Sequence, residues 1–554
     1  MKLKNSYLFI IIFSLAMSLA GCEMLDTRID TLPTEENINT NYSTLWGLGY
    51  APYTYLRNGF SSIDGNLFAA VSDEAEQTSP TSSTQLFNEG SWNAYRNPAN
   101  VYERCYEGIR ATNFFLENSE DYKTFLALNR DTISDGQRQY NLDVKDIAWL
   151  RNESRVLRAY FYFELIKRYG DVPLVTKVLT ADDNTDLTRT GFDEVVDFIV
   201  TEIDAVRNDL QSDWASYDVT QAGRITQGAA LAIKARTLLY AASPLNNSSN
   251  DLTKWEKAAT AAKELMELNQ YYLADDYQQL FVADNTAKSR ETIWALRLGT
   301  NNSFEIKNYP IATPGGESGV TPAQNLVGAY EYKGTPDPEN PYANRDPRLA
   351  YSIVTNNSFW NGRTMEIWAG GNDDEHNTNA SKTGYYLKKF LNPNLNLVQN
   401  ESKLRSWIVF RYAEVLLNYA EAMNEAFGPD DNNGGGMSAR QAVNAVRARS
   451  GVEMPAVDAD DQAGMRERIK HERRIELAFE DHRYWDLVRW KDAEEVLNQP
   501  LKGIKVMKNE DGSFSYTDFV VENRKFISPK MYRFPIPQVE ISKSEGVLVQ
   551  NPEW

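Results

Sequence analysis

The chain has 554 residues, 42% of them hydrophobic and 24% charged, which is typical of a globular protein long enough for more than one domain. Its formal net charge of −19 at pH 7 argues against non-specific nucleic-acid binding, which requires a positive field. The same acidity gives no support for a polybasic surface that would bind a membrane. The membrane-directed signal lies at the N-terminus alone.

The N-terminal residues have the pattern of an exported lipoprotein. Lys2 and Lys4 precede a mostly apolar run, Tyr7–Leu19, that is short for a transmembrane helix. Small residues then come directly before Cys22, which resembles the bacterial lipoprotein box, where cleavage precedes a cysteine that carries lipid. We therefore predict a signal peptide over residues 1–21 and lipid on Cys22. An ordinary signal peptide with an incidental cysteine is the alternative.

The sequence contains two cysteines, Cys22 and Cys105. If Cys22 carries lipid, Cys105 has no partner for an intramolecular disulfide. We therefore expect an exported protein that is stabilised by burial and not by disulfide bridges.

Helical periodicity dominates the chain. The clearest helix is Ile147–Tyr169, where the residues of one face recur every three or four positions and Gly170 can adopt a left-handed cap. Further helices are expected at residues 44–56, 101–116, 192–210, 226–242, 254–268, 409–426, 439–450 and 465–497. Neighbouring helices with small residues at close-contact positions predict a mainly α fold built on tetratricopeptide-like helix pairs. An ordinary helical bundle is the alternative.

Two regions depart from this helical pattern. Residues 275–405 are rich in Gly, Pro, Asn and aromatic residues, which indicates a loop-rich region with short strands such as Thr292–Leu298. So long an irregular region inside a compact protein is usually functional. Near the C-terminus, Gly503–Lys508 and Ser513–Val521 flank the turn Asn509–Gly512, which predicts a β-hairpin.

The stretch Glu472–Trp490 combines many charges with large aromatic side chains. Glu472, Glu476 and Glu480 are four residues apart, so on one helix face they would repel by roughly 0.2–0.5 kcal/mol per pair. Because apolar residues of the same stretch need burial, we predict that these carboxylates contact Arg or Lys from other segments. A solvated helix face is the alternative. The expected structural motif comprises Glu472, Arg473, Glu476, Glu480, Arg483, Asp486 and Trp490.

Motifs for catalysis, metals and cofactors are weak. The chain has three histidines, and the zinc-protease pattern that begins at His471 has Ile475 where the second histidine is required. The acidic, glycine-rich run at residues 430–436 lacks the glutamate that closes a calcium loop. We therefore predict no enzyme activity, cofactor or metal site, although a glycosidase that uses two of the many carboxylates stays open.

Aromatic residues in polar, irregular stretches suggest a binding function instead. Trp92 and Tyr95 flank Asn93, while Trp360 and Trp368 lie in the loop-rich region. Sugar rings have apolar faces that stack on aromatic rings and hydroxyls that take polar partners. These stretches therefore predict a glycan site. The alternative is that each aromatic side chain simply packs in the core.

The motifs together resemble the SusD/RagB family of outer-membrane nutrient-binding lipoproteins, and they occur along nearly the whole chain. They are LAGC at residues 19–22, SDEAE at 72–76, LRAYFYFELIKRYGDVP at 157–173, GRITQGAALAIKARTLLYAASP at 223–244, NRDPRL at 344–349, the stretch 472–490, FPIP at 534–537 and QNP at 550–552.

This resemblance implies a fold, a location and partners. It implies one SusD-like body over residues 22–554, with an N-terminal part to about 225 and a C-terminal part from about 226. It implies lipid on Cys22, exposure at the outer-membrane surface and a SusC-like TonB-dependent barrel transporter as partner. It also implies capture of a nutrient without chemistry, most often an oligosaccharide and sometimes a peptide.

The resemblance also indicates where a ligand would bind. In the starch-binding member, aromatic side chains from the region after the acidic motif and from the loop-rich middle contact the glucan. Here these regions contain the candidate ligand residues Trp92, Asn93, Tyr330, Trp360 and Trp368. Glycan binding is the leading hypothesis. A peptide-binding module and an interaction scaffold without a small ligand are the alternatives.

Overall fold

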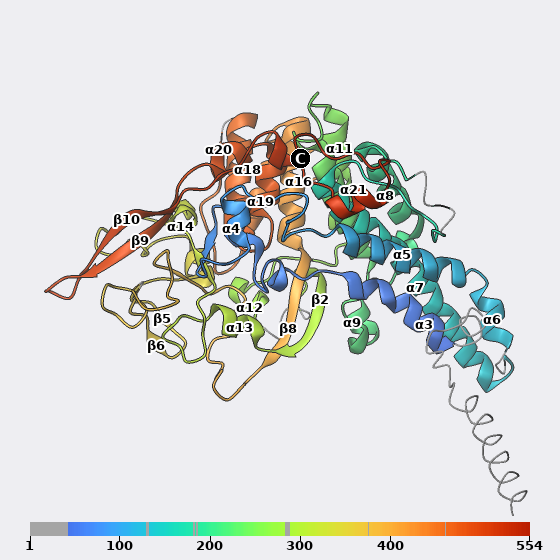
Figure 1. Cartoon of the computed structure of the whole chain (residues 1–554), viewed down its shortest axis with the longest axis horizontal. Helices are drawn as coiled ribbons and strands as arrows, with labels where there is room; N and C mark the ends of the chain where they lie inside the picture. Colours follow the sequence, from blue (N-terminus) through green and yellow to red (C-terminus); the bar gives the residue numbers. More distant parts are fainter. Residues whose placement is uncertain are drawn as a thin grey trace, which may run out of the picture. The chain divides into compact units, whose positions relative to one another are not determined.

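The computed structural model describes residues 42–128, 132–180, 183, 187–282, 289–374, 376–459 and 461–554 (Figure 1). The predicted signal peptide and Cys22 lie outside these residues, so both stay predictions. Within the described ranges, no helix has the length and apolar character that crossing a bilayer requires.

The chain divides into two compact units. Of the described residues, 42–47 and those within 118–147 form the first unit, and the others form the second. In the first unit, the Tyr140 hydroxyl donates to the backbone oxygen of Lys123 at 3.1 Å, which joins α7 to α6. The fold and the sites described below belong to the second unit.

Helices make up most of the regular structure, as predicted. In the N-terminal half they are α3 (Tyr42–Tyr50), α4 (Thr84–Asn88), α5 (Tyr102–Asn118), α6 (Tyr122–Leu128), α7 (Asp135–Tyr169), α8 (Phe192–Val206), α9 (Trp214–Tyr217), α10 (Gln227–Ala242), α11 (Leu252–Met266) and α12 (Tyr277–Leu280). In the C-terminal half they are α13 (Ser303–Asn308), α14 (Gln324–Ala329), α15 (Pro347–Ser352), α16 (Tyr412–Phe427), α17 (Ala439–Arg447), α18 (Gln462–Glu476), α19 (Arg483–Trp490), α20 (Ala493–Leu497) and α21 (Gln538–Lys543).

Helix α10 shows how the helix pairs are held together. It packs against α8, α11 and α16, and its alanines allow these helices to approach closely. The hydroxyl of Thr226 caps its first turn by accepting from the Ala229 N–H at 3.1 Å. Arg236, buried within α10, is neutralised by Glu414 of α16 at 2.6 Å. This arrangement confirms the predicted tetratricopeptide-like scaffold.

The helix boundaries differ from the predictions in instructive ways. The predicted helix Ile147–Tyr169 is the C-terminal part of α7, and Gly170 adopts the expected left-handed cap with φ of 72°. The helix predicted at residues 409–426 begins too early, because residues up to Arg411 continue strand β8. Phe410 pairs across that sheet with Trp294, and such cross-strand pairing overrides a local helical pattern.

The sheets of the described chain are small and antiparallel. The paired strands are β1 (Ala75–Gln77) with β3 (Val320–Pro322), β2 (Thr292–Asn301) with β8 (Lys403–Arg411), β4 (Ile353–Val354) with β7 (Tyr386–Leu387), β5 (Phe359–Trp360) with β6 (Arg363–Thr364), and β9 (Leu501–Lys508) with β10 (Phe514–Glu522). The last pair confirms the predicted C-terminal hairpin. Short elements joined by irregular segments also confirm the loop-rich region at 275–405.

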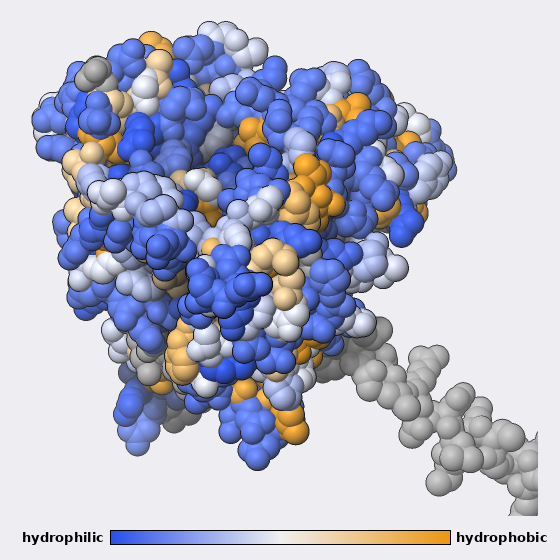
Figure 2. Space-filling model, turned by 90° about the vertical axis from the view of Figure 1, so that its left-hand side faces the viewer, coloured by the Kyte–Doolittle hydropathy of each residue, from blue (hydrophilic) through white to orange (hydrophobic). Residues whose placement is uncertain are grey.

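The β9–β10 hairpin projects from one side of the second unit (Figure 1). Viewed from that side, the surface is mostly hydrophilic, with apolar residues in small separate groups (Figure 2). Separate apolar groups of this kind are normal on a surface that faces water.

The stretch Glu472–Trp490 forms two helices, because the chain turns between the end of α18 and the start of α19. In this turn, Phe479 adopts a left-handed backbone conformation with φ of 66°. Glu480 also lies in the turn, so only Glu472 and Glu476 share a helix face. The expectation that three carboxylates form one row on a single helix was therefore wrong.

The carboxylates of this stretch meet basic side chains from other segments, which confirms the predicted contacts of Glu476 and Glu480. Glu476 accepts hydrogen bonds from Arg348 (2.8 Å), Arg411 (2.7 Å) and Arg449 (2.9 Å). Glu480 accepts from Arg411 and from Lys389, both at 2.7 Å. Burial alone would raise the pKa of Glu476, but the charges of its three arginines hold it well below its usual value.

The other residues of the motif continue this buried network. Arg348 also contacts Glu472 at 2.5 Å. Arg473 and Arg489 both bind Asp486, at 3.0 and 2.9 Å. The Trp490 indole N–H donates at 2.7 Å to Glu421 of α16, which Arg489 contacts as well. The motif therefore joins α16, α18 and α19 through buried charges.

The acidic segment 72–76 docks onto the turn between α18 and α19. The Asp73 carboxylate forms salt bridges with Arg474 and Arg483, with nitrogen–oxygen distances of 2.6 and 2.8 Å. Glu74 accepts the Phe479 backbone N–H at 3.2 Å, which supports the left-handed conformation there. A segment near the N-terminus thereby holds the C-terminal turn in place.

Glu74 makes stability depend on pH. Burial, and then the neighbouring charge of Asp73, raises the pKa of Glu74 to about 8. A carboxyl with a raised folded-state pKa stabilises the fold below its unfolded pKa, and that contribution is lost as the pH rises toward 8. Glu74→Gln cannot ionise and avoids this loss. As the pH rises from 5 to 9, we therefore expect its free energy of unfolding to increase by roughly 2–4 kcal/mol relative to that of the natural chain, measured by denaturant unfolding.

The matched control for this prediction is Glu89→Gln, because Glu89 is an exposed glutamate directly after α4. Glu89→Gln should change the free energy of unfolding by less than about 0.5 kcal/mol, as surface substitutions usually do. A Glu74→Gln difference that stays constant from pH 5 to pH 9 would contradict the expected titration.

Candidate functional site

Trp92 is a buried residue that supports the loop of the candidate site. Its side chain is 2% exposed, and its ring packs against Phe87, Phe534 and Trp554 with centroids 4.6–4.8 Å apart. These contacts bring the segment after α4 against the C-terminal residues of the chain. In this conformation the Trp92 ring offers no face to a ligand, and it serves as the foundation of the loop that follows.

Asn93 shapes that loop into a tight turn. Its side-chain oxygen accepts the backbone N–H groups of Tyr95 (2.9 Å) and Arg96 (3.1 Å). The backbone N–H of Gln538 donates to the Ala94 oxygen at 3.0 Å and fastens the turn to the start of α21. The Asn93 side chain is thus occupied in forming the turn.

Tyr95 lies at the tip of this turn and is 84% exposed. Beside it is a cavity of about 230 Å³, bounded by the loop and by the segment before and within α21. The lining residues are Ala94, Tyr95, Asn97, Asn100, Pro535, Pro537, Gln538 and Val539. An exposed ring beside amide groups and a small cavity can receive a ligand that has both apolar faces and hydroxyl groups.

At least one side-chain amide of the cavity has a hydrogen-bond donor that is not used within the described residues. The side-chain oxygen of Asn97 accepts the Ala99 N–H at 3.0 Å, while its nitrogen Nδ2 is buried without a hydrogen-bond partner among the described residues. The Asn100 oxygen accepts from the Tyr169 hydroxyl at 2.6 Å and from the Tyr102 N–H at 3.0 Å. An unpaired buried donor is costly, and a ligand oxygen would satisfy it.

The remaining sequence candidates lie in other packing groups. Tyr330 is 1% exposed, and Trp360 is 5% exposed with its ring edge-on to Tyr309 at 5.2 Å. Trp368 is partly buried against Phe514 of the β10 strand, and Lys508 covers its ring at 4.7 Å. The structure therefore does not gather the five candidates into one surface, and three of the rings are buried.

Sequence reasoning named Tyr95 among the aromatic residues of this stretch but did not include it in the five candidate ligand residues. It missed the amides Asn97, Asn100 and Gln538. A local signal existed, because the segment after Trp92 repeats asparagine and contains a proline, which is typical of turns. Gln538 lies hundreds of positions away, and only the tertiary fold brings it to the loop.

Metal coordination has no support within the described ranges. No group of three or more His, Cys, Asp and Glu side chains is arranged there to hold an ion.

Comparisons with known proteins agree on one relationship. Residues 280–554 match the model of the SusD family, and residues 53–239 match a model described as starch-binding and associating with the outer membrane. A SusD-like protein of Formosa agariphila is 27% identical over 379 residues, which cover 64% of this chain and 68% of that protein.

Two solved structures extend the similarity to the whole fold. A SusD-like carbohydrate-binding protein from Bacteroides fragilis is 28% identical, with a TM-score of 0.74, and the match covers 92% of this chain and 100% of that one. A second SusD-like protein from the same species is 27% identical, with a TM-score of 0.75 and coverage of 94% and 100%.

Proposed function

Because the chain belongs to the SusD/RagB family, we propose that it is a non-catalytic glycan-binding lipoprotein of the outer membrane. It captures oligosaccharides at the cell surface and delivers them to a SusC-like TonB-dependent transporter. Lipid on Cys22 would hold it beside that transporter and raise their local concentration. The observation that carries the proposal is the Tyr95 turn with its amide-lined cavity.

The size of the cavity suggests how a glycan would bind. At about 230 Å³ it is smaller than the roughly 300–1,000 Å³ of sites that enclose a drug-sized ligand. One sugar unit would enter it and accept the Asn97 Nδ2–H, while the next unit would stack on Tyr95. The carbohydrate-binding relative from Bacteroides fragilis supports this ligand class.

The proposed absence of catalysis rests on how the acidic groups are used. Glu476 and Glu480, the carboxylates of the charged stretch, are held by arginine and lysine and so are not free for acid–base chemistry. Burial holds the pKa of nearby His482 well below its usual value, which keeps it neutral.

We expect Tyr95→Ala to weaken glycan binding about 10- to 100-fold, which corresponds to losing about 1.5–3 kcal/mol of ring contact. Unfolding stability should change by less than about 0.5 kcal/mol, because the side chain is exposed. Isothermal titration with an oligosaccharide identified in a polysaccharide screen would measure the affinity.

The matched control is Tyr272→Ala, because Tyr272 is also exposed but lies outside the site. It should bind like the natural chain. Equal affinities for the Tyr95→Ala and Tyr272→Ala variants would remove Tyr95 from the site.

The wider proposal has separate tests. Purified protein without lipid should bind a glycan and leave it intact, and reducing ends that grow with protein concentration would refute the non-catalytic role. Blank glycan screens with competition by peptides would favour the peptide-binding alternative. Association with a barrel transporter and no tryptophan quenching by any nutrient would favour an interaction scaffold.

A further inference from the structure

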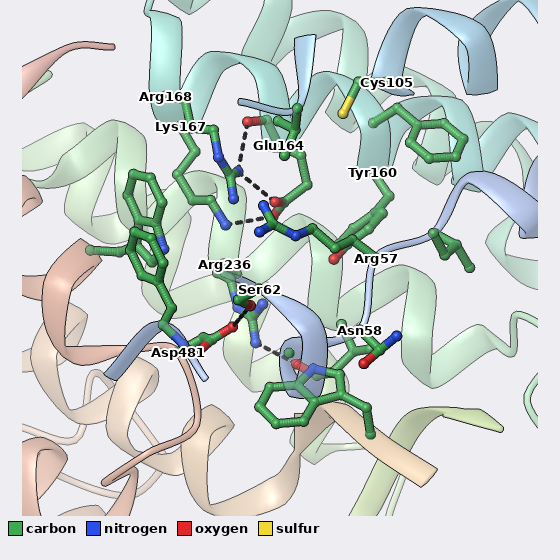
Figure 3. Close-up of a pocket in the computed structure, with 18 of the residues that line it drawn as sticks. Arg57, Asn58, Ser62, Cys105, Tyr160, Glu164, Lys167, Arg168, Arg236 and Asp481 are labelled. Atoms are coloured by element: carbon green, nitrogen blue, oxygen red, sulfur yellow. Dashed lines mark hydrogen bonds and ion pairs between the residues drawn. The ribbon is translucent and has the colours of Figure 1, made fainter. Parts of the chain in front are cut away.

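A second cavity lies inside the scaffold, apart from the residues around Tyr95. Its volume is about 80 Å³, and the segment 55–62, helices α5, α7 and α10, strand β8 and the turn before α19 enclose it (Figure 3). Ionisable side chains from several of these elements line it, so the cavity is polar. A space of this size admits a few water molecules or a group of a few heavy atoms, but no sugar ring.

The charges around this cavity do not balance. Arg57, Lys167 and Arg168 converge on the single carboxylate of Glu164 (Figure 3). Glu164 binds both α7 neighbours at 2.6 Å, Lys167 through one oxygen and Arg168 through the other. Arg57 has no hydrogen bond or ion pair to any described residue. Three cations therefore share one anion at this end of the cavity.

The opposite end supplies only part of the missing negative charge, because Arg57, Lys167 and Arg168 still outnumber the carboxylates of Glu164 and Asp481. Asp481 lines the cavity there, where its charge attracts Arg57, and its two oxygens accept from the Ser62 hydroxyl at 2.9 Å and the Phe68 N–H at 3.3 Å. Arg236, which also lines the cavity, is neutralised by Glu414. The nearby Glu480 is used by the network of the charged stretch.

Donor groups remain available at the cationic end. The Arg168 side chain is 7% exposed, and its Nε is buried without a partner among the described residues. Lys167 makes one hydrogen bond at 2.6 Å, although an ammonium can donate three. Burial, and then the charge of Arg168, lowers the pKa of Arg57 to about 10, as expected where positive charge is concentrated.

We propose that this cavity binds a small oxyanion, the size of acetate or sulfate, between Arg57, Lys167 and Arg168. Guanidinium groups suit this ligand because their N–H groups match two oxygens of one carboxylate or sulfate. The bound anion balances the excess charge and satisfies the orphan donors. It ties the segment 55–62 to the end of α7 and thereby stabilises the scaffold independently of the glycan site.

The test uses the full mature chain, dialysed into a chloride buffer. Sodium sulfate and sodium acetate are titrated at constant ionic strength, with binding heat and the unfolding temperature as readouts. We expect saturable binding of one of these anions at one site and a saturating rise in unfolding temperature. Sulfate also stabilises proteins generally by exclusion from their surface, and that effect does not saturate.

Variants distinguish binding of the anion at this site from the general stabilisation by sulfate. Arg57→Gln should weaken anion binding at least tenfold, because it removes the unpaired guanidinium. Arg110→Gln, at an exposed arginine of α5, should respond like the natural chain. If Arg57→Gln does not fold, Lys167→Gln serves in its place and should weaken binding as well.

Three results would overturn the proposal. They are an absence of binding heat with both anions, a rise in unfolding temperature that never saturates, and equal responses of the natural chain and the Arg57→Gln or Lys167→Gln variant. Glycan binding can be measured on the same samples, so failure here leaves the proposed function intact.

Discussion

Replacing Glu476 with alanine should lower the free energy of unfolding by about 3–5 kcal/mol, the usual cost of removing one partner from a buried ion pair. Glu476 has no exposed surface and contacts Arg348, Arg411 and Arg449. Its loss leaves these guanidinium groups buried with less negative charge around them. Chemical denaturation followed by tryptophan fluorescence would measure the shift.

The control for this substitution is Glu467→Ala on the same helix. The Glu467 side chain is 70% exposed and contacts Lys470 at 3.5 Å, so its pair should contribute less than about 1 kcal/mol. A Glu476→Ala variant as stable as Glu467→Ala would mean that the buried network contributes little to the fold.

Lowering the pH should also show that the stability of the fold depends on the ionised Glu476 carboxylate. The pKa of Glu476 is held low in the folded protein, so its contribution is present above the unfolded pKa and is lost as the pH falls toward the depressed folded value. The stability gap between the natural chain and Glu476→Ala should therefore narrow below about pH 4.5. Glu74 acts in the opposite direction, because its pKa is raised.

Replacing Trp92 with alanine should cost about 3–5 kcal/mol of stability, as large-to-small substitutions of buried aromatic residues do. It should also weaken glycan binding, because the rings of Phe87, Phe534 and Trp554 would lose the side chain that anchors the Tyr95 turn. Thermal unfolding and calorimetric titration on the same sample would report both effects.

Comparing Trp92→Ala with Tyr95→Ala distinguishes a residue that supports the turn from a residue that contacts the ligand. The Tyr95 variant should lose affinity at unchanged stability, whereas the Trp92 variant should lose both. Trp92→Phe, which refills part of the space, should recover most of the stability and of the binding. A Trp92→Ala variant that unfolds like the natural chain yet does not bind glycan would instead make Trp92 a direct contact.

The two sites depend on different physical features. The Tyr95 turn has an exposed ring above a rigid base, and rigid support lowers the entropy lost when a ligand is bound. The cavity at Arg57 is internal and polar, and the proposed anion there would balance buried positive charge. A substitution at one site should therefore leave binding at the other unchanged.

Local patterns in the sequence determined much of the fold. The periodicity of Ile147–Tyr169, the cap at Gly170 and the turn of the C-terminal hairpin depend on neighbouring residues, so they could be predicted directly. The unfavourable spacing of Glu472 and Glu476 also indicated that distant cations must compensate them, although it could not identify Arg348 or Arg411.

Tertiary structure decided what local patterns leave open. Trp92 and Tyr95 look alike in sequence, both being aromatic residues of one polar loop, yet one is 2% exposed and the other 84%. The difference arises because Phe534 and Trp554, far along the chain, close over Trp92 and leave Tyr95 at the tip. Burial depends on which distant segments meet, and for that reason the sequence determined the scaffold while only the tertiary structure decided the candidate site.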